Sequence, residues 1–240
     1  MDGRDRSGKP SGPDWLSYLG ELRIFAELGS LAPSLPALLS APRGDGHPVL
    51  VLPGILTGDE STFLLRRYLE ELGHVTHPWK QGHNWGPSPA LHDALRERLK
   101  ELSIRYQRRV SIVGWSLGGV FARELARELP SHVRQVITLG SPFGTARIIS
   151  DDETPESLER RRCPPPVPCT SIYSKSDGVI AWEACREQEA ENTDNIEVTS
   201  THIGMGFNPL VLWAIADRLS LPEDEWYPFD REGMHRLFYG

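Results

Sequence analysis

Residues 110–119, VSIVGWSLGG, join an apolar, β-branched run to a helical stretch that extends to Leu129. A Gly-x-Ser-x-Gly string occurs often by chance. This one stands between a strand signal and a helix signal, which is the context that a strained strand-to-helix turn requires. Its outer glycines, Gly114 and Gly118, leave room for the helix to turn back onto the strand. The segment therefore predicts a nucleophile elbow with the hydroxyl of Ser116 exposed at the turn.

Strand and helix signals alternate along the rest of the chain. Strands are expected at residues 49–52, 74–79, 110–113, 133–139, 170–173 and 196–199. Helices are expected at residues 62–72, 89–106, 117–129 and 210–219, with Ser61 capping the first and Gly73 ending it. Alternation at this spacing predicts βαβ units, and hence an α/β fold with a mostly parallel sheet flanked by helices.

Composition divides the chain into three regions. Residues 1–13 are rich in Gly, Ser, Pro and charge and predict a disordered tail, whereas residues 14–46 predict an N-terminal helical arm. Residues 47–240 form the expected α/β domain. Within it, residues 143–168 are charged, proline-rich and longer than a simple crossover, so they predict a short cap over the site.

The N-terminal arm carries apolar residues at three- and four-residue intervals. Asp14 is placed to cap this helix, and Pro33 and Pro36 are expected to break the segment after it. We interpret the arm as a helix packed on the core. A pocket flap or a weak lipid-facing surface is the alternative.

Bulk properties narrow the possible partners. The 240 residues suit one compact α/β domain, and a net charge of −7 without a long basic patch argues against nucleic acid. No apolar stretch reaches the ~18 residues of a membrane span. The polar start lacks the apolar core of a signal peptide, so a cytoplasmic location is expected. The three cysteines are expected to be reduced thiols, with a Cys163–Cys169 bridge as the alternative.

A serine hydroxyl needs a base to become a nucleophile, and the base needs an orienting group. Asp177 follows the strand expected at 170–173, and His202 follows the one expected at 196–199. Both therefore lie at carboxyl ends of strands, where parallel sheets place their ligands. The alternatives are that Asp177 is a turn residue before Gly178 and that His235 is the base.

The tetrahedral intermediate of such a reaction needs two backbone N–H donors. One is expected from Leu117, directly after the nucleophile. The other is expected from Ile55, where Gly54 lets the backbone turn after an early strand. Trp115, Gly54 and Phe143 are the candidate substrate contacts. Trp115 is expected to pack against the oxyanion or acid side. Residues 81–85 could help wall an acyl pocket with Trp79 and Phe143, although these aromatic residues are equally well explained as core.

The motifs that carry a family resemblance are Pro53-Gly54-Ile55, residues 114–119, Leu139-Gly140-Ser141-Pro142-Phe143, residues 176–179 and the His202 segment. Together they resemble the α/β-hydrolase superfamily, lipase/esterase type, over residues 49–219. Two features depart from many members: Pro53-Gly54 replaces His-Gly, and the cap is short. The resemblance implies a cofactor-free serine hydrolase that cleaves carboxylic esters through a Ser116–His202–Asp177 triad and an acyl-enzyme.

Several alternatives stay open at this point. An acyltransferase uses the same triad, and a hydrolase fold can serve as a non-catalytic binding module. The expected partner is a small-molecule ester or lipid, and the sequence leaves ester, thioester or amide and the oligomeric state open. A metal site at His74, His77 and His83 is not expected, because residues three apart in a strand point to opposite faces.

Overall fold

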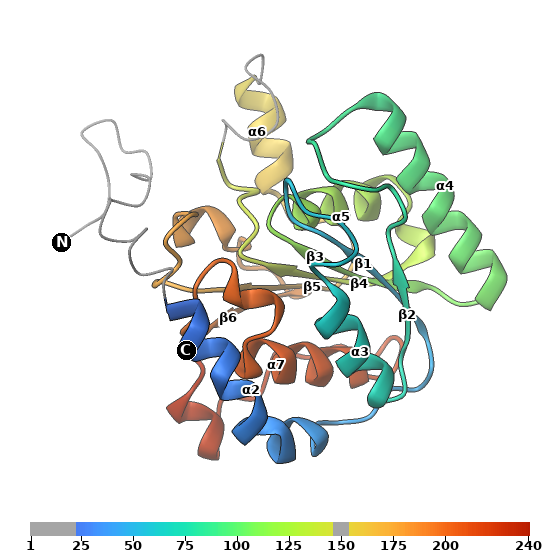
Figure 1. Cartoon of the computed structure of the whole chain (residues 1–240). Helices are drawn as coiled ribbons and strands as arrows, with labels where there is room; N and C mark the ends of the chain where they lie inside the picture. The colour runs from blue at the N-terminus through green and yellow to red at the C-terminus, as the bar shows by residue number, and fades with distance from the viewer. Residues whose placement is uncertain (1–22, 146–153) are drawn as a thin grey trace, which may run out of the picture.

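The computed structural model describes residues 23–145 and 154–240, so the expected tail and the start of the arm lie outside the described residues. Six parallel strands form one sheet in the order β2-β1-β3-β4-β5-β6 (Figure 1). Their bounds are β1 Pro48–Leu52, β2 Val75–Pro78, β3 Val110–Trp115, β4 Val133–Leu139, β5 Cys169–Tyr173 and β6 Thr193–Glu197. The expected α/β class and parallel sheet are confirmed.

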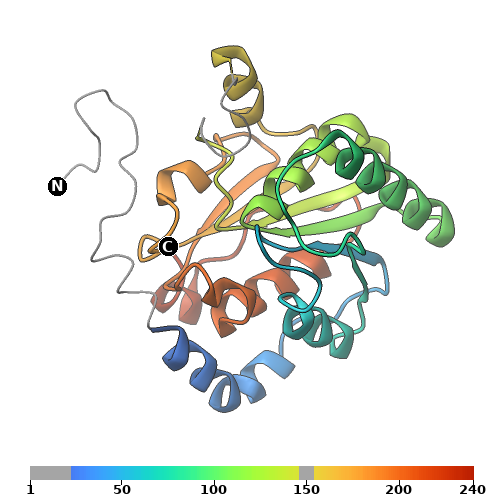
Figure 2. The ribbon, with the colours of Figure 1, turned by 45° about the horizontal axis from the view of Figure 1, so that its top comes forward.

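Helices cover both faces of the sheet. Figures 1 and 2 show α4 (Pro89–Tyr106) and α5 (Leu117–Glu128) on one face, and α2 (Ile24–Leu39), α3 (Phe63–Glu71) and α7 (Pro209–Ser220) on the other. The insertion after β4 carries α6 (Pro155–Arg162), and its residues 146–153 lie outside the described ranges. Short 3-10 helices are η2 (Pro130–His132), η3 (Trp182–Cys185), η4 (Gly204–Gly206) and η5 (Gly233–Leu237).

The central strands are apolar on both faces because helices cover both. In β1, Leu50 and Leu52 pack into the core beneath α4 and α5, whereas Val49 and Val51 pack into the core beneath α3 and α7. This alternation of side chains places two hydrophobic layers around the sheet. The carboxyl ends of the strands are left to form the site.

Local sequence signals explain the helices that were predicted best. Ser88 Oγ accepts a hydrogen bond of 3.2 Å from Leu91 N, Pro89 occupies the first turn of α4, and Gln107 ends it with φ +50. In the same way, Asn208 Oδ1 caps α7 by accepting from Leu210 N at 2.9 Å. Caps and hydrophobic spacing point to the same boundaries, so the expected helix at 89–106 is confirmed.

Two local expectations are wrong. Ser61 does not cap α3, because its hydroxyl donates to Gly58 O at 2.7 Å and to Thr57 Oγ1 at 3.1 Å. The last strand runs over Thr193–Glu197 instead of 196–199, because pairing with β5 begins at Thr193 opposite Cys169. An edge strand with alternating burial shows a weaker apolar run than a central one.

Prolines do not end the N-terminal arm. Helix α2 continues through Pro33 and Pro36 to Leu39, in contrast to the expected break. Each proline removes one backbone hydrogen bond. Leu31 and Leu38 nevertheless pack into the core, and Tyr68 Oη donates to Leu38 O at 3.0 Å. Tertiary packing therefore overrides the local signal.

Two further sequence expectations concern the membrane and the cysteines. Among the described residues, no helix has the length and apolar character to cross a bilayer. Cys163, Cys169 and Cys185 are free thiols, so the alternative Cys163–Cys169 bridge is not formed.

Candidate active site

Ser116 occupies the turn between β3 and α5. Its φ of +52° and ψ of −123° lie in a region that costs a non-glycine residue about 1–3 kcal/mol. The turn is held by Ser116 N, which donates to Leu139 O at 2.8 Å, and by Gly119 N, which donates to Ser116 O at 3.0 Å. Such strain persists only where the surroundings impose it, and here it turns the side chain out at the sheet edge.

Glycines make this turn possible by allowing close backbone approach. A Cβ at Gly118 would lie 2.5 Å from the carbonyl oxygen of Leu52, and a Cβ at Gly114 would overlap Gly119. Real Cβ atoms do not approach backbone this closely. The spacing of the glycines in the motif therefore follows from the packing of α5 against β1 and β3.

His202 connects the serine to a carboxylate. Its Nε2 lies 3.1 Å from Ser116 Oγ, and its Nδ1 lies 2.7 Å from Asp177 Oδ2. An ionised carboxylate only accepts hydrogen bonds, so in the neutral ring Nδ1–H donates to Asp177 and Nε2 accepts from the serine hydroxyl. The structure thus brings together the three side chains that the sequence placed at strand ends.

The carboxylate of Asp177 accepts hydrogen bonds both from the backbone of its own turn and from His202. Its Oδ1 accepts from Val179 N and Ile180 N, both at 2.8 Å, which leaves Oδ2 for the imidazole. The turn-residue alternative is therefore compatible with the position next to His202. In contrast, His235 lies beside Trp213 and Phe229 and its Nδ1 donates to Asp230 O, away from Ser116.

Known proteins share this architecture. The structure is similar to Aspergillus fumigatus lipase B, with a TM-score of 0.59 and 20% sequence identity over 78% of this chain and 56% of that one. It is also similar to Bacillus licheniformis lipase BlEst2, with a TM-score of 0.57 and 13% identity over 76% of this chain and 95% of that one. The chain has the α/β-hydrolase fold.

The relative found by sequence matches a smaller part of this chain than the structural neighbours do. No family model matches the chain. Over 109 residues it is 33% identical to the lysosomal thioesterase PPT2 homolog of Drosophila melanogaster, which corresponds to 41% of this chain and 38% of that protein. The chain thus spans well under two thirds of both this relative and lipase B.

The expected oxyanion loop follows β1, as in the sequence prediction, but it turns differently. Gly54 lies against the elbow, with its Cβ position 3.4 Å from Ser116 Cβ, and it does not have a positive φ. The left-handed residue is Leu56, with φ +61°. Within the described residues, the backbone N–H groups of Ile55 and Leu117 have no protein acceptor. Both are therefore available to a ligand.

Sequence reasoning missed Asn84, which holds this loop. Its side-chain Nδ2 donates to Pro53 O at 3.0 Å, and its backbone carbonyl oxygen accepts from Leu56 N at 2.7 Å. Asn84 is fully buried. The available signal was its position in the polar segment after β2, which was interpreted as a pocket wall.

Glu27 is a second residue that was missed. From α2 it accepts hydrogen bonds from Thr201 N at 2.7 Å and Thr201 Oγ1 at 2.8 Å, directly before His202. Trp115 Nε1 holds the same loop by donating to His202 O at 3.1 Å. A single charged residue in the apolar segment 24–39 was the signal for Glu27.

Of the expected substrate contacts, Gly54 lies beside Ser116, but the two aromatic residues lie in the core. Trp115 is buried against His202, and Phe143 is fully buried with its ring 3.9 Å from the Arg123 guanidinium. The burial of Phe143 supports its interpretation as core, whereas Trp115 packs beside the base. A substrate role for either residue stays a prediction. The three histidines that were considered for a metal lie apart: His74 contacts His47, His77 contacts Tyr106 and His83 contacts Trp85.

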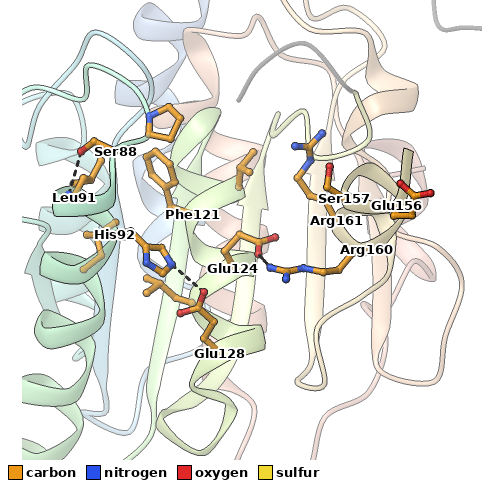
Figure 3. A pocket seen from close by; sticks show the side chains of 14 residues that line it. Ser88, Leu91, His92, Phe121, Glu124, Glu128, Glu156, Ser157, Arg160 and Arg161 are labelled. Carbon is orange, nitrogen blue, oxygen red and sulfur yellow. Dashed lines mark hydrogen bonds and ion pairs between the residues drawn. The ribbon is translucent and has the colours of Figure 1, made fainter. Parts of the chain in front are cut away.

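A groove of about 610 Å³ lies between α4, α5 and α6 (Figure 3). Its inner wall is apolar and consists of Leu91, Leu95, Val120, Phe121 and Leu125. Charged pairs line its rim, with His92 3.0 Å from Glu128 and Arg160 2.8 Å from Glu124. Val120 lies four residues after Ser116 on α5, so the groove begins about 6 Å along the helix from the serine.

A second Ser–His–Asp contact lies at the other end of the sheet. His47 Nδ1 is 2.6 Å from Asp45 Oδ1, and His47 Nε2 is 2.8 Å from Ser111 Oγ. Ser111 and His47 are both fully buried, and Ser111 lies inside strand β3. Hydrogen-bond geometry alone does not distinguish the two sites. Ser111 is 0% exposed, whereas Ser116, which is less exposed than the sequence predicts, keeps 6% of its surface at the end of β3.

This second cluster predicts a pH-dependent stability. Burial lowers the pKa of His47 to about 4, and burial also lowers the pKa of His74 to about 4. Between pH 6.5 and pH 4 the unfolded chain therefore binds protons that the folded chain does not, and stability falls as the pH falls. From pH 6.5 to 5 we expect a loss of about 1.5 kcal/mol per histidine in urea unfolding, because the unfolded histidine is already half protonated at pH 6.5. His74→Leu should remove one of the two contributions, and equal stability of wild type at the two pH values would contradict this account.

Proposed function

We propose that the protein is a serine hydrolase that cleaves carboxylic acid esters or thioesters through an acyl-enzyme. The observation that carries the proposal is the hydrogen-bonded chain from Ser116 through His202 to Asp177 on a strained elbow. Lipases among the structural neighbours and a thioesterase among the sequence relatives support a hydrolase, and the thioesterase favours including sulfur esters.

The reaction is derived from the positions of these groups. Ser116 Oγ attacks the acyl carbonyl carbon while His202 Nε2 takes the hydroxyl proton, and Asp177 stabilises the resulting imidazolium. The oxyanion accepts hydrogen bonds from the Leu117 and Ile55 N–H groups. When the intermediate collapses, the C–O or C–S bond breaks and Nε2 returns the proton to the leaving alcohol or thiol. Water then attacks the acyl-enzyme with His202 again as base.

Covalent labelling tests the assignment of the nucleophile. A fluorophosphonate probe should add once to the protein, and peptide mapping should locate the adduct at Ser116. Adding methanol to the hydrolysis assay measures how much acyl group goes to alcohol instead of water, which separates hydrolysis from acyl transfer. An adduct elsewhere, or no adduct, would contradict the proposal.

We further propose that an apolar acyl chain lies in the groove between α4, α5 and α6. Leu91→Trp should fill part of this groove and lower kcat/KM for a dodecanoyl ester relative to an acetyl ester by about tenfold, because a misfitted apolar group loses a few kcal/mol of binding at most. Ile104→Trp is the matched control, since Ile104 is exposed on the same helix outside the groove. An unchanged chain-length profile in Leu91→Trp would place the acyl chain elsewhere.

A further inference from the structure

Helix α2 is unusual for a surface helix because nearly all of it is apolar. Its sequence, IFAELGSLAPSLPALL, contains one charged residue, Glu27. Phe25, Leu28, Leu35 and Leu39 are all exposed and lie on one stripe, at the three- and four-residue spacing of a helix. We call these four residues the α2 face. Single exposed apolar residues are ordinary, but an apolar stripe along a whole helix marks an interaction surface.

The stripe of α2 that borders the α2 face already has its partners. Leu31 and Leu38 pack into the core, and Glu27 is used on the loop that carries His202. Among the described residues, none buries the α2 face, whose four side chains are each about half exposed or more. These side chains are available to contact a further surface.

The α2 face continues toward the exposed residues Ile203, Leu56 and Trp85 on the loops beside Ser116, which we call the mouth of the candidate active site. The Glu27–Thr201 hydrogen bonds place the first turns of α2 beside Ile203, which is exposed next to His202. Across the mouth, Leu56 and Trp85 are exposed and are joined through the hydrogen bond from Leu56 N to Asn84 O. Gly54 lies beside Ser116 and His202 is hydrogen-bonded to it, so the loops that carry these exposed apolar side chains flank the serine on two sides.

We propose that the α2 face and the apolar residues around the mouth dock on a lipid surface without net charge. The choice of occupant rests on the proposed function, because a surface continuous with the mouth would meet the phase that carries the acyl substrate. A second copy of the chain seated there would instead cover the mouth. Charge indicates the kind of lipid. Residues 24–39 contain no Lys or Arg, and Arg23, directly before the helix, is a single cation that donates to Ser176 O. With a net charge of −7 on the chain, anionic headgroups meet no basic cluster on the α2 face.

Vesicle flotation tests this proposal with the full chain. The wild type and Ser116→Ala should both float with phosphatidylcholine vesicles, and adding phosphatidylserine should not increase binding. Phe25→Ser/Leu28→Ser should bind at least tenfold more weakly. Ile104→Ser is the matched control, because Ile104 is 71% exposed, close to the 76% of Phe25, but lies on α4 on the other face of the sheet.

The flotation experiment includes a control for folding and several results that would overturn the docking proposal. Retained p-nitrophenyl acetate hydrolysis by the double variant shows that it is folded, and Phe25→Ser alone replaces it if it is not. The proposal is overturned if the wild type does not float, if the α2 variants float as well as Ile104→Ser, or if light scattering shows that the variants convert a dimer to a monomer. Flotation by a protein without esterase activity would sink the proposed function and leave the docking surface standing.

Discussion

Ser116→Ala is expected to lower kcat for p-nitrophenyl butyrate by about 10⁴- to 10⁶-fold, the range seen when a triad nucleophile is removed. The substitution removes the only protein atom that the mechanism places on the acyl carbon and leaves the two backbone N–H donors intact. The variant should keep its far-UV circular dichroism spectrum. It should lose both turnover and labelling by the fluorophosphonate probe.

The buried cluster provides a control with nearly the same contacts. Ser111 Oγ lies 2.8 Å from His47 Nε2, compared with 3.1 Å between Ser116 Oγ and His202 Nε2. Ser111→Ala should leave turnover within about twofold and lower the free energy of unfolding by about 1 kcal/mol, the typical net contribution of one hydrogen bond. If Ser111→Ala abolished activity and Ser116→Ala did not, the assignment of the site would be wrong.

Gly140→Ala is expected to lower kcat by about 100-fold, the cost of a small misplacement of catalytic groups. Gly140 has φ +52°, and a Cβ there would lie 3.2 Å from both Asp177 Oδ2 and His202 Nδ1 and 2.8 Å from Met205 Sδ. The added methyl group would therefore press between the carboxylate and the imidazole. KM should change much less than kcat, since this contact orients the base rather than the substrate.

Gly82→Ala separates this effect from backbone strain. Gly82 also has a left-handed φ, +73°, but a Cβ there would meet nothing within 4 Å. It should lose about 1 kcal/mol of stability with kcat unchanged. Equal kcat values for Gly140→Ala and Gly82→Ala would show that Gly140 does not hold the Asp177–His202 pair.

Strand and helix positions near the sheet centre could be predicted because several local signals agree there. The run at 133–139 becomes a strand buried on both faces, and α4 has both a cap and a regular apolar spacing. Prediction failed where local signals oppose packing. In α2, packing against the core keeps the helix intact despite its two prolines. The edge strand β6 has no continuous apolar run that marks its bounds.

The sequence by itself determined the order of the elements, the elbow at Ser116, and the positions of Asp177 and His202 after strands, because these depend on short-range spacing and on the direction of a parallel sheet. Tertiary structure alone decided that Glu27 and Asn84 support the two loops beside the serine, that the loop after β1 turns at Leu56, and that a groove opens along α5. Each of these features joins side chains or surfaces far apart in the chain. Such contacts depend on packing among several elements at once, which no local pattern encodes.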